Sequence, residues 1–121
     1  MEINSLFVYG TLCDPETQRK IIGRTLKGIP ARLEGYERRE GKWPYIVPKK
    51  GGDVQGLLLC ALNETDMVRL DAYEGVEPRW DAGQLRRFYI REPVTVAARE
   101  KKNHLCWVYM PHLADWPEHW R

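Results

Sequence analysis

The sequence predicts an α+β fold, a curled or closed mixed sheet of about six short strands with two short helices packed against it. Short runs of β-branched and aromatic residues bounded by glycine or proline recur along the chain, whereas only two segments carry helix start and stop signals. The proportion of about six strands to two short helices argues against a doubly wound nucleotide-binding sheet, in which strands and long helices alternate. The 121 residues suit one domain, residues 1–121, that buries its core without disulfides or metals.

The N-terminal part of the chain is expected to form a strand followed by a helix. Residues 6–9 are a short apolar run, which favours a buried strand over a helix. Asp14 before Pro15 is typical of a helix start, because aspartate caps the first turn and proline fits the first helical position. This helix should extend to about Ile22, where Gly23 follows.

Glycines and prolines divide the middle of the chain into strand segments. Gly35 predicts a bulge or a close backbone approach, and Pro44 and Pro48 restrict the segment between them to a short or edge strand. Gly56 is the weak point of the strand that follows. The expected elements are a bent strand at 29–40, a short strand at 45–47, a turn at 49–53 and a strand at 54–62.

A second helix is predicted between Asn63 and Gly75. Asn63 is a favourable N-cap, Asp66 at the third helical position resembles the acidic member of a capping box, and Gly75 suits a left-handed helix end. A polar loop should follow this helix. The remaining expected elements are strand segments at 87–91 and 94–99 interrupted at Pro93, a polar hairpin loop at 100–103, and a strand at 105–110.

Glu74 is a carboxylate that the second helix places on its apolar face. At about 100° per residue, the mean direction of the apolar side chains falls within roughly 20° of Glu74. These side chains are Met67, Val68, Leu70 and Tyr73. A core-facing carboxylate must be paired, hydrogen-bonded or protonated. Burial, the helix dipole and nearby Asp71 all disfavour ionisation, which moves the pKa towards the neutral range where a general base works best.

Two interpretations of Glu74 have similar weight from the spacing alone. In the first, Glu74 is a general base in a site. In the second, it forms a structural ion pair with an arginine such as Arg79, Arg87 or Arg91, because structural pairs are common for buried carboxylates. For Arg91, which shares a strand segment with Tyr89, a structural pair with a carboxylate of the helix is the favoured role.

Composition and charge argue against several classes of function. The net charge of +2 is too small to favour a nucleic-acid binder, although three basic pairs leave a weak patch. These pairs are Arg38/Arg39, Arg86/Arg87 and Lys101/Lys102. No segment resembles a signal peptide or a membrane-spanning run, so we expect a cytoplasmic protein with no membrane partner.

The cysteines and histidines give no metal-binding pattern. Cys13, Cys60 and Cys106 lack close pairing, which favours free thiols over a disulfide framework or a zinc site. The histidines lack helical i, i+4 spacing, and they are His104, His112 and His119. We therefore expect no metal site.

The loop after the first strand is a candidate ligand-binding segment. Gly10 lets backbone N–H groups approach a ligand, and the N–H groups at the following helix start favour anionic atoms such as a carboxylate. Taken alone the signal is weak, because most glycines between a strand and a helix form tight turns only. No second glycine pattern indicates a phosphate loop.

Several segments together resemble the γ-glutamylcyclotransferase-like family, which includes the plant avirulence-induced-gene proteins and bacterial homologues. The resemblance extends along nearly the whole chain, including Asp115, Trp116 and Trp120 of the tail. Each motif alone is common, but their order and spacing in so short a chain make the combination specific. The segments are residues 7–12, residues 43–48, Gly56 and residues 70–75.

The resemblance implies a small mixed β-barrel with flanking helices and a cavity at its mouth. In that family the loop holds the α-amino and α-carboxylate end of a γ-glutamyl group. Its counterparts here are Val8, Tyr9, Gly10, Thr11 and Leu12. The acid that matches Glu74 is the base, and Tyr109 falls where a tyrosine of the last strand lines the pocket.

The implied reaction is intramolecular aminolysis of a γ-glutamyl compound to 5-oxoproline and a free amine, without a metal or cofactor. The leaving group remains open among a free amino acid, a lysine side chain, glutathione and a specialised metabolite. The partner is then a small γ-glutamyl molecule, and the chain is expected to be a monomer or weak homodimer.

Two other functions compete with this one. A binding module of the same fold would keep the pocket without turnover, and a basic nucleic-acid binder is a weaker alternative. Aromatic side chains could line a pocket, but packing in the core or tail is the favoured role for Trp107, Trp116 and Trp120.

Overall fold

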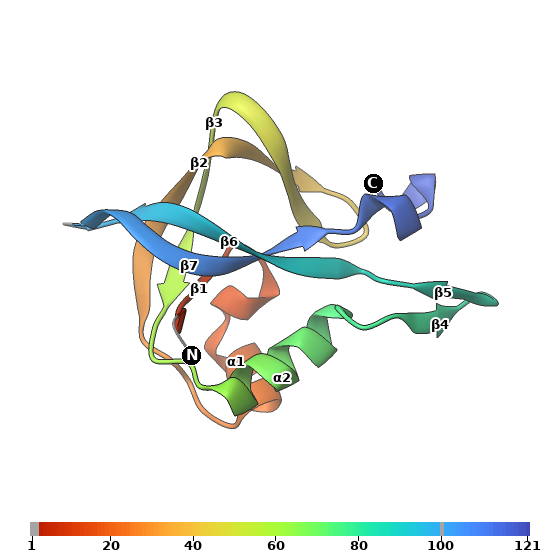
Figure 1. Ribbon diagram of the computed structural model, residues 1–121, viewed down its shortest axis with the longest axis horizontal. Coiled ribbons are helices and arrows are strands. Elements are labelled where there is room, and N and C mark those ends of the chain that lie inside the picture. The colour runs from red at the N-terminus through yellow and green to blue at the C-terminus, as the bar shows by residue number, and fades with distance from the viewer. Residues whose placement is uncertain (1–2, 100) are drawn as a thin grey trace.

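The computed structural model describes residues 3–99 and 101–121, whose strands close into a mixed barrel in the order β1-β3-β2-β6-β7 (Figure 1). All neighbouring strands are antiparallel except β1 and β7, which are parallel. The barrel strands are β1 (Leu6–Val8), β2 (Gly28–Glu40), β3 (Pro44–Leu59), β6 (Tyr89–Ala98) and β7 (Lys101–Pro111). The predicted α+β class with a closed mixed sheet is confirmed.

Two helices lie side by side against one end of the barrel, α1 (Pro15–Ile22) and α2 (Glu64–Glu74) (Figure 1). Both predicted helices are confirmed, and left-handed glycines end them at Gly23 and Gly75. The Asn63 side chain accepts from the Asp66 N–H, and the Asp66 carboxylate accepts from the Asn63 N–H, which completes the capping box. Arg24 pairs with the same buried aspartate, so this helix start is tied to the chain after α1.

The turn expected at 49–53 is wrong, because β3 continues through it as one strand. Gly51 has a φ of +78°, and this conformation lets the strand bend without reversing. Pro48 lies opposite Tyr36, next to the predicted bulge at Gly35, in a part of β3 whose described ladder is with β2 alone. The missing proline N–H therefore breaks no ladder on the other side.

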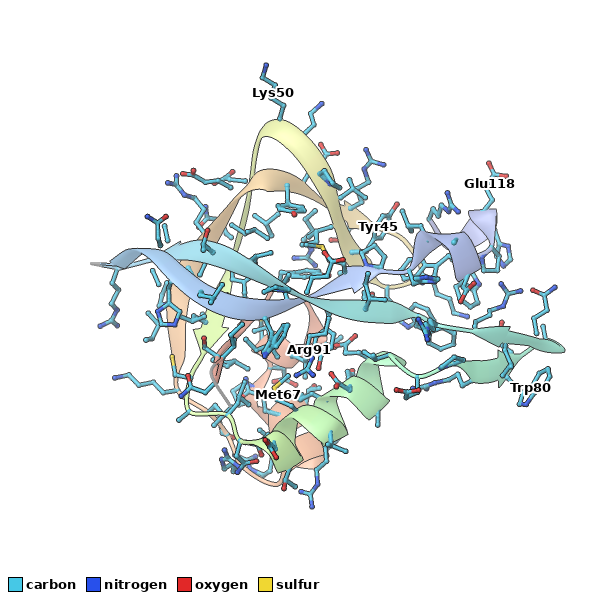
Figure 2. The ribbon with its side chains drawn as sticks, viewed as in Figure 1. Tyr45, Lys50, Met67, Trp80, Arg91 and Glu118 are labelled. Atoms are coloured by element: carbon cyan, nitrogen blue, oxygen red, sulfur yellow. The ribbon has the colours of Figure 1, made fainter. Side chains whose placement is uncertain are left out.

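The polar loop expected after α2 contains a short hairpin, β4 (Arg79–Asp81) and β5 (Gln84–Arg86). Ala82 and Gly83 both have positive φ, which is typical of a two-residue turn that matches strand twist. The hairpin extends away from the barrel, and its exposed Trp80 points away from the body of the molecule (Figures 1 and 2).

The C-terminal strands are longer than predicted. Pro93 does not interrupt β6, since it pairs with Trp107 of β7, and β7 begins within the expected hairpin loop at 100–103. Position 100 lies outside the described residues. The tail forms two short 3₁₀ turns, Leu113–Asp115 and Glu118–Trp120, and packs two buried tryptophans, Trp116 and Trp120, against the barrel, as predicted.

Alternating side chains on the strands divide the core into two parts. Phe7 belongs to a cluster built from strand residues and their flanks, whereas Leu6 and Val8 face the cluster that includes Met67 and Leu70 of α2. The end of β1 therefore lies between the core of the barrel and α2. Within residues 3–99 and 101–121, no helix has the length and apolar composition needed to cross a membrane.

Candidate functional site

A cavity of about 200 Å³ opens where β1 ends, beside the last turn of α2. All the site residues predicted from the sequence line it. They are Val8, Tyr9, Gly10, Thr11, Leu12, Glu74 and Tyr109. Three separate parts of the chain, the first loop, α2 and β7, thus contribute to one cavity.

The loop that follows β1 turns into a short 3₁₀ helix, Thr11–Cys13. Two carbonyl oxygens of this loop already accept hydrogen bonds. Gly10 accepts from the Cys13 N–H at 3.0 Å, and Thr11 accepts from the Asp14 N–H at 3.1 Å. The N–H groups of Thr11 and Leu12 have no acceptor among the hydrogen bonds of the described residues. The first N–H groups of a helical turn lack partners within it, so they can bind an anionic group in the cavity.

Glu74 is the last residue of α2, and its carboxylate faces this cavity. Among the described residues the carboxylate forms no ion pair and accepts no side-chain hydrogen bond. Burial raises the pKa of Glu74 to about 8. The group can therefore both accept and return a proton near neutral pH.

The buried face of α2 differs in part from the face that the helical wheel predicts. Met67 and Leu70 are buried as predicted, but the side chains of Val68 and Tyr73 are 69% and 43% exposed. Glu74 consequently lies at the edge of the buried face, where the helix meets the cavity.

The arginines proposed as structural partners of Glu74 contact other groups. Arg79 donates to the Ala72 carbonyl, and Arg91 forms an ion pair of 3.4 Å with Asp71. Arg91 points from β6 towards α2 (Figure 2), so its predicted pairing with a carboxylate of this helix is confirmed. None of the ion pairs found between described residues involves Arg87 or Glu74.

Three buried tyrosines of the cavity wall donate their hydroxyl protons to the protein, each at 2.7 Å. Tyr9 donates to the Tyr109 carbonyl, Tyr89 to the Pro44 carbonyl, and Tyr109 to the Asp71 carboxylate. Burial, with a contribution from the Glu74 charge, raises the pKa of all three tyrosines. Because each proton is already used, these hydroxyls offer the cavity only acceptor lone pairs, which suit an ammonium group.

The outer part of the cavity is aromatic and carries a positive charge. Trp43 and Phe88 pack with ring centroids 5.3 Å apart, and the Arg79 guanidinium lies 5.1 Å from the Phe88 centroid. Thr11 and Tyr73 join the two sides of the rim through a hydroxyl–hydroxyl contact of 2.9 Å. Arg79 and Tyr73 are exposed, so this part is the mouth of the cavity.

Several lining residues were not predicted as site residues. They are Phe7, Trp43, Pro44, Tyr73, Arg79, Phe88 and Tyr89. Trp43 and Pro44 belong to a segment that carried the family resemblance, and this resemblance was the sequence signal that could have identified them as lining residues. Arg79 begins the hairpin that was missed in the sequence and Phe88 follows it, which explains why their approach to the cavity was not foreseen.

A family model described as gamma-glutamyl cyclotransferase, AIG2-like, matches residues 6–120. The chain belongs to this family. AIG2-like protein A of Arabidopsis thaliana is 34% identical over 80 residues, which cover 64% of this chain and 48% of that protein. The chain spans about half the length of the curated relatives it matches first.

Solved structures show the same fold. The solution structure of an Arabidopsis thaliana protein has a TM-score of 0.77 and 26% identity, covering 100% of this chain and 76% of that one. A structure titled gamma-glutamyl cyclotransferase has a TM-score of 0.74 and covers 89% of this chain and 66% of that one. At 21% identity, this second similarity concerns the fold alone.

The side chains that could bind a metal are sparse. The described residues contain no group of three or more histidine, cysteine, aspartate or glutamate side chains placed to bind a metal ion. Cys13, Cys60 and Cys106 are free thiols. Glu74 is the one carboxylate among the described lining residues, which makes it the candidate for proton transfer.

The raised pKa of Glu74 predicts a pH-dependent stability. Between its ordinary pKa near 4.5 and its folded pKa of about 8, the folded protein keeps a proton that the unfolded chain loses. The free energy of unfolding should therefore fall as pH rises through this window. Glu74→Gln removes the effect, so the variant should gain up to a few kcal/mol over the natural protein between pH 5 and pH 9, at about 1.4 kcal/mol per pKa unit.

Urea denaturation at the two pH values measures this difference. Glu77→Gln is the matched control, because Glu77 is exposed and lies outside the cavity lining. A stability difference between Glu74→Gln and the natural protein that is equal at pH 5 and pH 9 would contradict the raised pKa.

Proposed function

We propose that this protein is a γ-glutamyl cyclotransferase that converts a γ-glutamyl amine or amino acid to 5-oxoproline and a free amine. The observation that supports this most is the Glu74 carboxylate, which faces the cavity without a protein partner among the described residues. Its raised pKa gives it proton affinity close to that needed at neutral pH. The family membership supports the same reaction class.

The substrate's two charged α-groups have matching partners in the cavity. The α-carboxylate would accept hydrogen bonds from the N–H groups of Thr11 and Leu12, next to Gly10. The α-ammonium would donate to the acceptor-only hydroxyls of Tyr9, Tyr89 and Tyr109, beside Glu74. This placement bends the glutamyl chain so that its amine approaches its own γ-carbonyl.

Proton transfer then runs through a single residue. Ionised Glu74 accepts one proton from the α-ammonium, and the neutral amine attacks the γ-carbonyl carbon to form the ring C–N bond. The tetrahedral intermediate collapses with cleavage of the original amide C–N bond. Protonated Glu74 gives its proton to the leaving nitrogen and then accepts the proton that the ring nitrogen loses. It passes this second proton to the released amine, which leaves as ammonium, so Glu74 ends the cycle ionised.

The size of the cavity supports a small substrate that is only partly enclosed. At about 200 Å³ it is smaller than the ~300–1,000 Å³ of sites that enclose drug-sized ligands. It therefore suits the γ-glutamyl unit, while the leaving group extends through the mouth. A cytoplasmic location, a monomeric or weakly dimeric state and the absence of nucleic-acid and membrane partners remain predictions.

The test is a screen of γ-glutamyl compounds with detection of 5-oxoproline, using Glu74→Gln as the blank. Product formation above the blank supports a cyclotransferase. Saturable binding of γ-glutamyl compounds without product would instead indicate the non-catalytic binding protein, and strongly salt-dependent binding to RNA or DNA would indicate the nucleic-acid alternative.

The proposal also predicts a pH–rate profile. In the free enzyme Glu74 must be ionised, so kcat/KM should rise with pH and level off above about 8, the pKa of this group. In the enzyme–substrate complex the substrate ammonium stabilises the ionised Glu74 carboxylate and lowers its pKa. The rise of kcat with pH should therefore occur at lower pH than the rise of kcat/KM. Steady-state rates between pH 5 and pH 9 measure both limbs; a flat profile would contradict the role of Glu74.

A further inference from the structure

Arg79 is a cation at the mouth of the cavity that the proposed chemistry does not use. It begins β4, directly after the loop that follows α2, and its side chain lines the cavity. It is exposed, whereas Tyr9, Tyr89 and Tyr109, which surround Glu74, are buried. Arg79 therefore lies further out than the groups that would perform the reaction.

The Arg79 guanidinium is fixed in place but not neutralised. It donates to the Ala72 carbonyl in the last turn of α2 and stacks on the Phe88 ring at 5.1 Å. None of the ion pairs found between described residues includes it. A guanidinium has five N–H donors, so most of them remain available to a ligand.

The substrate's leaving group must pass this position. The reacting amide lies near Glu74 in the inner part, and the cavity is too small to enclose much more than the γ-glutamyl unit. The substrate atoms beyond the leaving nitrogen then lie at the mouth of the cavity, which Trp43, Phe88 and Arg79 line. A carboxylate on the carbon next to that nitrogen is the group that a fixed guanidinium binds best.

We propose that Arg79 is a specificity-determining residue that selects substrates whose leaving group is an α-amino acid over those that release a simple amine. This inference rests on the proposed cyclotransferase function and assigns the other half of its substrate. The Arg79 N–H groups donate to the leaving group's α-carboxylate, while the aromatic wall contacts its side chain. The glutamyl α-carboxylate is bound separately, at the N–H groups of the first loop.

Two substrates that differ in one group test the inference. γ-Glutamylalanine and γ-glutamylethylamide release alanine and ethylamine, which differ only by the carboxylate. The natural protein should show a kcat/KM about tenfold or more higher for γ-glutamylalanine, as expected for a hydrogen bond to a charged group. Arg79→Gln should lose this preference by slowing γ-glutamylalanine alone, with γ-glutamylethylamide changed less than about twofold.

The controls separate specificity from structure. Arg87→Gln removes the same charge from an exposed arginine outside the cavity lining and should keep the preference. Equal losses for both substrates in Arg79→Gln would overturn the inference, because they would indicate a role in the fold or at the glutamyl carboxylate. Equal, measurable rates of the natural protein on both substrates would overturn it as well.

A binding measurement distinguishes failure of this inference from failure of the proposed function. Calorimetry with the Glu74→Gln protein and the double variant with Arg79→Gln compares the dissociation constants of the two compounds without turnover. If the natural protein forms no 5-oxoproline, a carboxylate preference in binding that disappears with Arg79 would support the inference and reject catalysis. Equal dissociation constants, or binding of neither compound, would overturn the inference.

Discussion

Glu74→Gln is expected to lower kcat by about 10²–10⁴-fold, the usual contribution of a general acid–base residue. Glutamine has nearly the shape of the protonated carboxyl, but it neither accepts nor returns a proton. The substrate should still bind, since the N–H groups of the first loop and the three tyrosine hydroxyls are unchanged. Single-turnover formation of 5-oxoproline, together with calorimetric binding of the same substrate, measures the two effects.

The matched control for this experiment is again Glu77→Gln, which removes an exposed carboxylate three residues further along the chain and should leave kcat unchanged. Rates for Glu74→Gln equal to those of the natural protein would show that another group moves the proton. A loss of binding with a matching loss of kcat/KM, at unchanged kcat, would instead place Glu74 in substrate recognition.

The Glu74 site could be located from the sequence because local signals specify it. Asn63, Asp66 and Gly75 set both ends of α2, and helical geometry then fixes which residue reaches its last turn. The wheel could not decide between a base and an ion pair, because the partner of a carboxylate depends on tertiary contacts. Those contacts direct Arg91 to Asp71 and leave Glu74 facing the cavity.

The parts that were mispredicted depend on pairing between distant residues. Gly51 and its neighbours resemble a turn locally, yet pairing with β2 resumes on both sides of them, Pro48 with Tyr36 and Asp53 with Glu34, so they form an irregular bend within one strand. In the same way, Pro93 does not end β6, because it pairs with Trp107 of β7 while the described ladder between β6 and β2 involves only Ala97 and Ala98 of β6. The hairpin β4–β5 was assigned to a loop because each strand is only three residues long, too short to show alternation.

The first loop itself was singled out by Gly10 and by the family resemblance, whereas its depth in the molecule was not predictable. That depth depends on β1 lying between β3 and β7, which no local pattern specifies. At Gly56, β3 packs closely against the end of β1. A Cβ atom there would lie 2.3 Å from the Val8 carbonyl oxygen and 2.8 Å from the Phe7 ring.

Gly56→Ala is therefore expected to impair both stability and activity. The Val8 carbonyl cannot rotate away as a side chain would, so β1 must shift, and the loop of Gly10 and Thr11 shifts with it. Overpacking of this kind costs about 1–3 kcal/mol in unfolding free energy. Displacement of the loop by even part of an ångström should lower kcat/KM by more than that loss of stability explains, because the reaction depends on the alignment of amine and carbonyl.

Gly28→Ala is the matched control, since its added Cβ would meet only the Leu57 side chain, at 3.1 Å, which can adjust. Urea denaturation and kcat/KM measured in conditions where both variants are fully folded separate the two effects. If Gly56→Ala retains full activity once folded, the position of β1 does not control the loop. The other outcome is that folded Gly56→Ala loses activity while Gly28→Ala keeps it. Close contact between β3 and the end of β1 then sets the geometry in which Glu74 meets its substrate.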